Sequence, residues 1–131
     1  MANMDKGRPW PYLSVCVTSN HDMPTLRMQN AEKVGDVSGS PEADLHPDEV
    51  RAIIWDHLKS ASMLAIMPLQ DWLALDSGLR RKDYMNERVN QPADPDNHWR
   101  FRFHIDLNVL LSEKAAALTA DVTDLLRNSG R

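Results

Sequence analysis

The chain has 131 residues, of which 42% are hydrophobic and 26% are charged, and these proportions are typical of a folded globular domain rather than a disordered segment. Its formal net charge of −4 disfavours nucleic acid or an anionic membrane surface as the main partner. Cys16 is the single cysteine, so it has no partner for an internal disulfide, and we expect it to be a buried and inert core residue.

The first half of the chain predicts a lead-in, a strand, a loop and a helix. Prolines keep residues 1–12 extended, and a short apolar run predicts a buried strand over residues 13–19. Pro24 argues against a helix directly after that strand, and the polar stretch 29–46 predicts a loop. A helix is predicted to begin near Pro47, because proline suits the first helical position and acidic residues follow it. Its apolar face consists of Val50, Ile53, Ile54 and Leu58.

The second half predicts a strand, a short helix, a long loop, an extended segment and a final helix. The continuous apolar run 63–67 predicts a strand that is buried on both faces, as in a parallel sheet, and the apolar residues after it predict the short helix. Charged residues and turn formers over 79–98 predict the loop. Alternating aromatic and basic residues over 99–105 predict a half-buried extended segment. The final helix is expected over about residues 112–127, with Ser112 as its N-cap.

This order of elements predicts an α/β fold with two parallel strands. Two strands do not make an independently stable sheet, so the pattern indicates part of something larger. We therefore expect residues 1–131 to form a single partial domain. Its strand edges should be exposed and available for self-association.

The most informative motif is the sequence TSNHDMPTLR at residues 18–27, directly after the first predicted strand. A His21-Asp22 pair at the carboxyl end of a strand lies where barrel enzymes place catalytic groups. The pair could also bind a metal ion, although the other histidines show no spacing typical of metal ligands. A third interpretation is structural, with Asp22 capping the turn before Pro24. The motif alone leaves all three interpretations open.

The aromatic residues of the segment 99–105 allow three interpretations. With Arg100 and Arg102 they could stack on bases and contact phosphates, but the acidic balance of the chain argues against nucleic acid. Trp72 and Trp99 could instead stack on sugar rings. Inward packing is the commoner role of a large aromatic side chain, so we expect these rings to lie mainly in the core.

Four blocks of the sequence resemble the C-terminal part of the 4-α-glucanotransferases, also called amylomaltases or disproportionating enzymes, of glycoside hydrolase family 77. The blocks occur in the order of the family and together span most of residues 11–111. They are residues 11–15 with 18–27, residues 54–58 with 62–64, residues 68–73, and residues 87–95 with 98–102.

The resemblance implies a (β/α)8 barrel that transfers α-1,4-glucan segments between maltooligosaccharides, with retention of configuration through a covalent glycosyl-enzyme. The family uses a nucleophilic aspartate, an acid/base glutamate and a second aspartate that stabilises the oxocarbenium-like transition state. Asp22 matches this second aspartate, and His21 matches the histidine that contacts the same sugar. Asn90 and Pro92 match the loop that lines the substrate.

The same resemblance places Gln70, Asp71 and Arg27 where they would support the site from behind, and it implies neither a metal ion nor another cofactor. The nucleophile and the acid/base residue lie upstream in the family. A barrel needs about 250 residues, so we expect a C-terminal fragment that holds only the last strands and helices of the barrel and is inactive alone.

Two alternatives remain beside the enzyme fragment, a non-catalytic α-glucan-binding remnant and a small α/β domain without sugar function. The sequence shows no apolar run of membrane-spanning length and no signal-like segment, so a cytoplasmic protein is expected, with a secreted protein trimmed of its signal left open.

Overall fold

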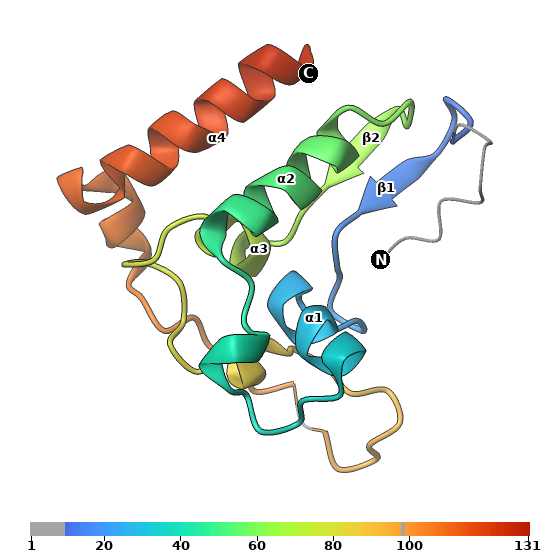
Figure 1. The fold of residues 1–131 in the computed structure, drawn as a ribbon, viewed down its shortest axis with the longest axis vertical. Coiled ribbons are helices and arrows are strands. Elements are labelled where there is room, and N and C mark those ends of the chain that lie inside the picture. The colour runs from blue at the N-terminus through green and yellow to red at the C-terminus, as the bar shows by residue number, and fades with distance from the viewer. Residues whose placement is uncertain (1–9, 98) are drawn as a thin grey trace.

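A computed structural model describes residues 10–97 and 99–131, so most of the expected lead-in 1–12 and His98 lie outside the described residues. Helices outnumber strands in the described part, and short 3-10 turns connect them (Figure 1). The strands and α-helices are β1 Val15–Val17, α1 Leu26–Val34, α2 Pro47–Leu58, β2 Leu64–Ile66, α3 Leu69–Leu73 and α4 Ala116–Ser129. The 3-10 turns are Pro41–Ala43, Tyr84–Glu87, Leu107–Leu111 and Glu113–Ala115.

The strands β1 and β2 form a parallel pair, with Val15 opposite Leu64 and Val17 opposite Ile66. This confirms the predicted α/β class with two parallel strands, although both strands are shorter than the ranges 13–19 and 63–67 predicted for them. Helices α1 and α2 lie between the strands in sequence, as a parallel connection requires. Cys16 is buried as expected, and its Sγ lies 3.4 Å from the carbonyl oxygen of His57 in α2.

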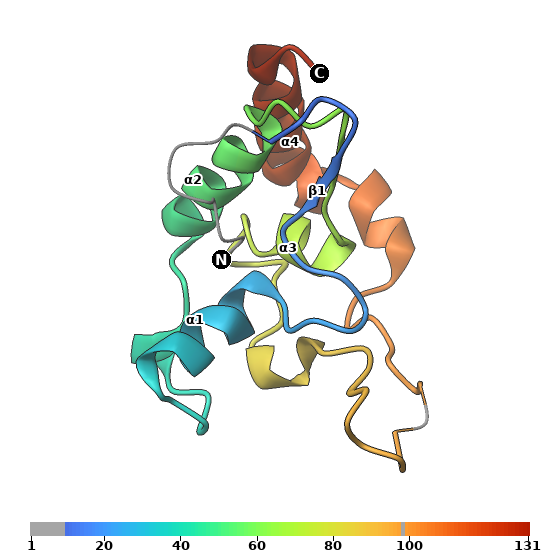
Figure 2. The same cartoon turned by 90° about the vertical axis from the view of Figure 1, so that its right-hand side faces the viewer.

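The main core lies between the sheet, α3 and the two long helices α2 and α4, which run side by side (Figures 1 and 2). Helix α2 begins at Pro47 as predicted, and a capping box formed by His46 and Glu49 closes its N-terminus. The apolar face of α2 packs against α4 in this core. The buried residues of the two helices are Val50, Ile54, Leu58, Leu118 and Leu125.

The opposite face of the sheet is open. Val15 is 50% exposed, Leu64 48% and Ile66 55%, so the prediction that the run 63–67 is buried on both faces is wrong for this chain. The reason is geometric, because Cys16 and Ala65 point toward α2 while the residues on either side of them point away from it. Within the described part of the chain, this leaves a continuous apolar surface on a sheet of two strands.

The predicted loop 29–46 is wrong in its first part, because α1 begins at Leu26, two residues after Pro24. The helix is polar overall, yet it buries Leu26 in the main core and Met28 and Ala31 in a second apolar cluster. It ends at Gly35, which has a left-handed φ of 76°, a conformation that suits glycine.

Two further predictions need correction. The loop 79–98 contains the 3-10 turn Tyr84–Glu87, whose first and last side chains are buried. In the segment 99–105, Trp99 has a left-handed φ of 53°, which interrupts the predicted extended path at that residue. Trp99 and Phe103 are exposed, so the expected inward packing of the alternating aromatic residues is wrong for both of them.

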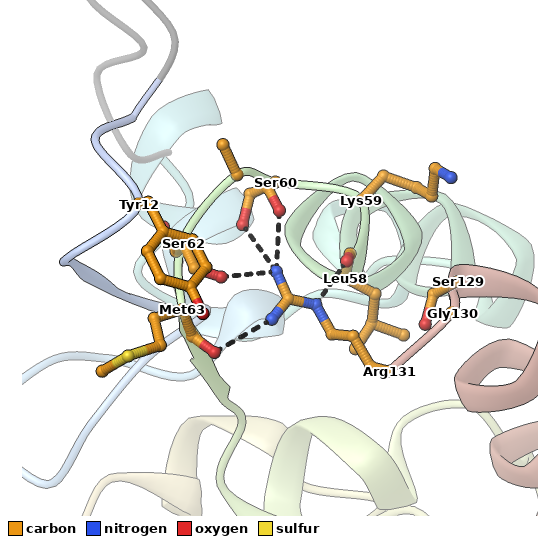
Figure 3. Close-up of a pocket in the computed structure, with 10 residues that line it drawn as sticks. Tyr12, Leu58, Lys59, Ser60, Ser62, Met63, Ser129, Gly130 and Arg131 are labelled. Atoms are coloured by element: carbon orange, nitrogen blue, oxygen red, sulfur yellow. Dashed lines mark hydrogen bonds between the residues drawn. The ribbon is translucent and has the colours of Figure 1, made fainter.

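The last helix, α4, begins at Ala116 rather than near residue 112, because Ser112 caps the preceding 3-10 turn by accepting from the backbone N–H of Lys114. After α4, the guanidinium of Arg131 donates to the carbonyl oxygens of Leu58 at 2.5 Å, Ser60 at 2.7 Å and Ser62 at 2.8 Å (Figure 3). These contacts tie α4 to the connection between α2 and β2. None of the helices in the described residues has the length and apolarity needed to cross a bilayer.

Candidate active site

The His21-Asp22 pair lies in a tight turn that follows β1. The side-chain oxygen of Asn20 accepts from the backbone N–H groups of Asp22 at 2.9 Å and of Met23 at 3.1 Å, so Asn20 caps the turn. The side chains of His21 and Asp22 are 60% and 49% exposed, with 3.3 Å between His21 Nε2 and Asp22 Oδ2. The structural interpretation of Asp22 as the capping residue is therefore wrong, and its carboxylate partly faces solvent.

Asn90 comes from the long loop and meets this turn at two points. Its side-chain amide donates to Asp22 Oδ1 at 2.6 Å, and its backbone N–H donates to the carbonyl oxygen of His21 at 3.0 Å. Asn97 in turn donates to the side-chain oxygen of Asn90 at 2.5 Å. Asn90 itself is buried, so the structure brings it together with Asp22 as the neighbour that orients the carboxylate.

Trp99 completes the exposed part of the site. Its ring centroid lies 5.4 Å from that of His21, and the residue is 58% exposed. Pro92 is exposed on the same loop, two residues after Asn90. Trp72, the other candidate for sugar stacking, is instead half-buried and packs against the main core.

Asp71, in the middle of the short helix α3, is buried behind the turn. It accepts three hydrogen bonds, from the hydroxyl of Thr18 at 2.5 Å, the hydroxyl of Ser19 at 2.7 Å and the backbone N–H of Leu26 at 3.0 Å. Burial raises the pKa of Asp71, and these hydrogen bonds oppose the rise. Because Thr25 forms no side-chain cap for α1, the Asp71 carboxylate provides the anion at the N-terminus of that helix.

Arg27 is also buried, and it forms the centre of a network of ion pairs. Its guanidinium donates to both carboxylate oxygens of Asp44, at 2.7 and 2.6 Å, and to Glu87 Oε1 at 2.7 Å. Glu87 Oε2 accepts from the hydroxyl of Thr25 at 2.9 Å. Burial raises the pKa of Glu87, and the charge of Arg27 opposes the rise.

A small cavity of about 130 Å³ adjoins the turn, and Ser19, His21, Gln70 and Glu87 are among its lining residues. The side chain of Gln70 is buried and reaches the backbone oxygen of Glu87 at 3.5 Å. Gln70, Asp71 and Arg27 therefore lie behind the turn and not on the surface that carries His21 and Asp22.

The sequence did not identify Glu87, Asp44 or Asn97 as part of this arrangement. Asp44 lay in a stretch expected to be an unstructured loop, where an acidic residue carries no signal of burial. Glu87 lay in one of the blocks that resemble the family, three residues before Asn90, and this position was the only available pointer. Both carboxylates pair with Arg27, a partner far away in the sequence, and a single sequence does not reveal such partners.

The exposed groups suit a neutral, hydroxyl-rich ligand. A carboxylate accepts hydrogen bonds from hydroxyl groups, an imidazole can donate or accept, and an exposed indole offers a flat apolar face. No group of three or more His, Cys, Asp or Glu side chains placed to hold a metal ion occurs among residues 10–97 and 99–131.

Comparison with known proteins identifies the family of this chain. The profile of the family described as 4-alpha-glucanotransferase matches residues 2–108. The chain is also 36% identical over 141 aligned positions to the 4-alpha-glucanotransferase DPE2 of Oryza sativa subsp. japonica, an alignment that covers 98% of this chain and 15% of the rice protein. No solved structure matches the chain significantly. On both the profile and the rice relative, this chain belongs to the 4-α-glucanotransferase family, glycoside hydrolase family 77.

Proposed function

We propose that this chain supplies one part of the active site of a retaining 4-α-glucanotransferase, which transfers α-1,4-glucan segments between maltooligosaccharides. The observation that carries the proposal is the partly exposed Asp22 carboxylate after the carboxyl end of a parallel strand, oriented by Asn90 and flanked by His21 and Trp99. Ligand sites of parallel sheets lie at this end of the strands.

In this proposal Asp22 accepts hydrogen bonds from the hydroxyls of the sugar at the reacting centre. These bonds strengthen as positive charge develops on the ring, so the carboxylate lowers the energy of the transition state more than that of the bound substrate. His21 contacts the same sugar, and the loop that contains Asn90 and Pro92 lines the substrate. The nucleophile and the acid/base residue would come from elsewhere in the protein, and no cofactor takes part.

We further propose that the fold is a partial (β/α)8 barrel. The open apolar face of Val15, Leu64 and Ile66 supports this, because a strand pair inside a barrel has neighbours on that side and on both edges. The chain spans 15% of the length of the rice relative, which leaves ample chain for the remaining strands. We propose a cytoplasmic location, and the net charge of −4 gives no reason to expect nucleic acid or an anionic membrane as partner.

The test uses disproportionation of maltotriose, followed as glucose release, in the full-length protein that contains this chain. Asp22→Asn should lower kcat by about 100- to 1000-fold, as removal of one transition-state hydrogen-bonding group does in other enzymes. Asp124→Asn, at an exposed position on α4, is the matched control and should keep full activity. Full activity of Asp22→Asn would overturn the assigned role. The isolated 131-residue chain should release no glucose, and measurable release would contradict the proposal that the other two carboxylates lie outside it.

A second candidate is α-glucan binding without turnover, which the exposure of Trp99 beside His21 favours. Calorimetry of the isolated chain with maltooligosaccharides separates the two. Binding that Trp99→Ala abolishes, without glucose release, would support a binding role for this part of the protein. No heat of binding would favour a domain without sugar function.

A further inference from the structure

We propose that Glu87 is a positioning residue for Asp22. By joining the 87–90 segment to the 18–27 segment, Glu87 sets the place at which the Asn90 amide meets the Asp22 carboxylate. The inference deepens the proposed function and rests on it for its kinetic consequence, while its structural consequence is independent of activity.

The first step of the argument is the contact of Glu87 with the far end of the 18–27 segment. Both carboxylate oxygens are used, one by the hydroxyl of Thr25 at 2.9 Å and the other by the guanidinium of Arg27 at 2.7 Å. Glu87 is only 3% exposed, so these bonds lie in an environment of low polarity, where hydrogen bonds are stronger than in water. This end of the segment is therefore fixed against Glu87 by two hydrogen bonds.

The second step is the contact of Asn90 with the near end of the same segment. Asn90 bonds the backbone of His21 at 3.0 Å and the carboxylate of Asp22 at 2.6 Å. Three residues of chain extend over no more than about 10 Å, so the place of Glu87 limits where Asn90 can lie. The 87–90 segment thus spans the turn and holds it at both ends.

The third step is the rigidity of the partner side. The guanidinium of Arg27 donates to both carboxylate oxygens of Asp44 and to the backbone oxygen of Arg81 at 2.7 Å. These contacts hold the guanidinium in position independently of its bond to Glu87. A buried ion pair contributes little net stability compared with apolar residues of the same size. What it does provide is a fixed geometry, because a bidentate arginine contact tolerates little displacement.

The first measurement is kinetic and uses the full-length protein. Glu87→Gln keeps the size of the side chain but removes its charge, and Glu42→Gln is the matched control at an exposed position. We expect Glu87→Gln to lower kcat for maltotriose disproportionation by about 10- to 100-fold with KM little changed, since Glu87 does not touch the sugar. The double variant with Asn90→Ala should lose no more than the larger single loss, because both act through the position of Asp22.

The second measurement is hydrogen exchange on the same proteins. In Glu87→Gln, peptides over 18–27 and the Asn90 amide should exchange faster, while peptides from α2 and α4 stay unchanged. Thr25→Val, which removes one of the two donors to Glu87, should give the same pattern at smaller amplitude and serves as the test if Glu87→Gln does not fold.

Unchanged exchange at Asn90 in both variants would overturn the inference, and so would faster exchange spread equally over α2 and α4. Additive losses of kcat in the double variant would overturn it as well. If the unmodified protein shows no transferase activity, the proposed function fails, and hydrogen exchange alone then decides the role of Glu87.

Discussion

Replacing Asp71 by alanine tests whether one buried carboxylate holds the turn and helix α1 in place. The substitution removes the acceptor for three groups at once, the hydroxyls of Thr18 and Ser19 and the backbone N–H of Leu26. All three donors belong to the stretch that leads from β1 into α1. The loss should therefore affect the region around His21 and Asp22 before it affects the α2–α4 core.

The magnitude follows from these bonds. A buried donor left without an acceptor costs about 1–3 kcal/mol, with hydroxyls at the low end because they can rotate toward another acceptor. Removal of the carboxylate also relieves the cost of burying it, which is the same effect that raises the pKa of Asp71. The balance predicts a loss of about 2–4 kcal/mol in the free energy of unfolding, or about 10 °C in Tm for a domain of this size.

The assay is urea unfolding of the 131-residue chain at pH 7, followed by far-UV circular dichroism. Asp71→Asn, which keeps one acceptor oxygen, should fall between the unmodified chain and Asp71→Ala. Asp124→Ala, at an exposed position on α4, should lie within about 0.5 kcal/mol of the unmodified chain. A loss below about 1 kcal/mol for Asp71→Ala would show that the three hydrogen bonds do not support this region, and the reasoning would be refuted.

Three further predictions concern pH, association and the C-terminus. Burial raises the pKa of Asp71 above its ordinary value of 3.8, so the part of the unfolding free energy that depends on protonation of Asp71 is complete below that pH and is lost as the pH rises through the raised value. The three hydrogen bonds tested at pH 7 contribute in addition to this part. The difference in unfolding free energy between the unmodified chain and Asp71→Asn should therefore shrink over that window in urea titrations, and a difference that grows with pH would contradict the sign. Ile66→Lys should make the isolated chain sediment as a monomer at concentrations where the unmodified chain associates through its open sheet face, and a monomeric unmodified chain would count against that surface. Arg131→Ala should speed hydrogen exchange in the last turn of α4 and cost about 1–2 kcal/mol through the lost bonds to Leu58 and Ser60, whereas unchanged exchange would show that those bonds are unimportant.

The elements that the sequence predicted well are those with strong local signals. Pro47 with the acidic residues after it marks the start of α2, and the spacing of Val50, Ile54 and Leu58 marks its buried face. The two apolar runs predicted parallel strands because β-branched and other apolar residues gather there without charges. These signals depend on near neighbours, which a sequence shows directly.

Helix α1 was missed because its stability comes from distant residues. Its own sequence is polar, and the carboxylate at its N-terminus belongs to Asp71, which follows β2. The period of two over 99–105 predicted an extended, half-buried segment, and Trp99 departs from this prediction because its φ is left-handed and its side chain is exposed. Within the described residues, Trp99 lies beside His21 instead of in a sheet.

In the candidate site, too, the sequence indicated positions but not the contacts between distant residues. The resemblance pointed to His21, Asp22 and Asn90 by position, and the structure brings these three together. Neither the motif nor its spacing indicated that Asn90 bonds Asp22 directly, or that Glu87 and Asp44 share Arg27. Contacts between residues far apart in sequence are fixed by the packing of α1 against the 3-10 turn Tyr84–Glu87.

The cap of α1 by Asp71 also has a consequence for the order in which the chain folds. A helix of nine residues is too short to persist alone in water, and its N-terminal anion becomes available only after the chain has closed a loop of 45 residues. We therefore expect α1 and the turn before it to form late, after α2 has packed on the strands. Mutations in α1 should then give φ-values near zero, which means that its native contacts are not yet formed in the transition state. The surface that carries Asp22 would be the last part of this chain to acquire its shape.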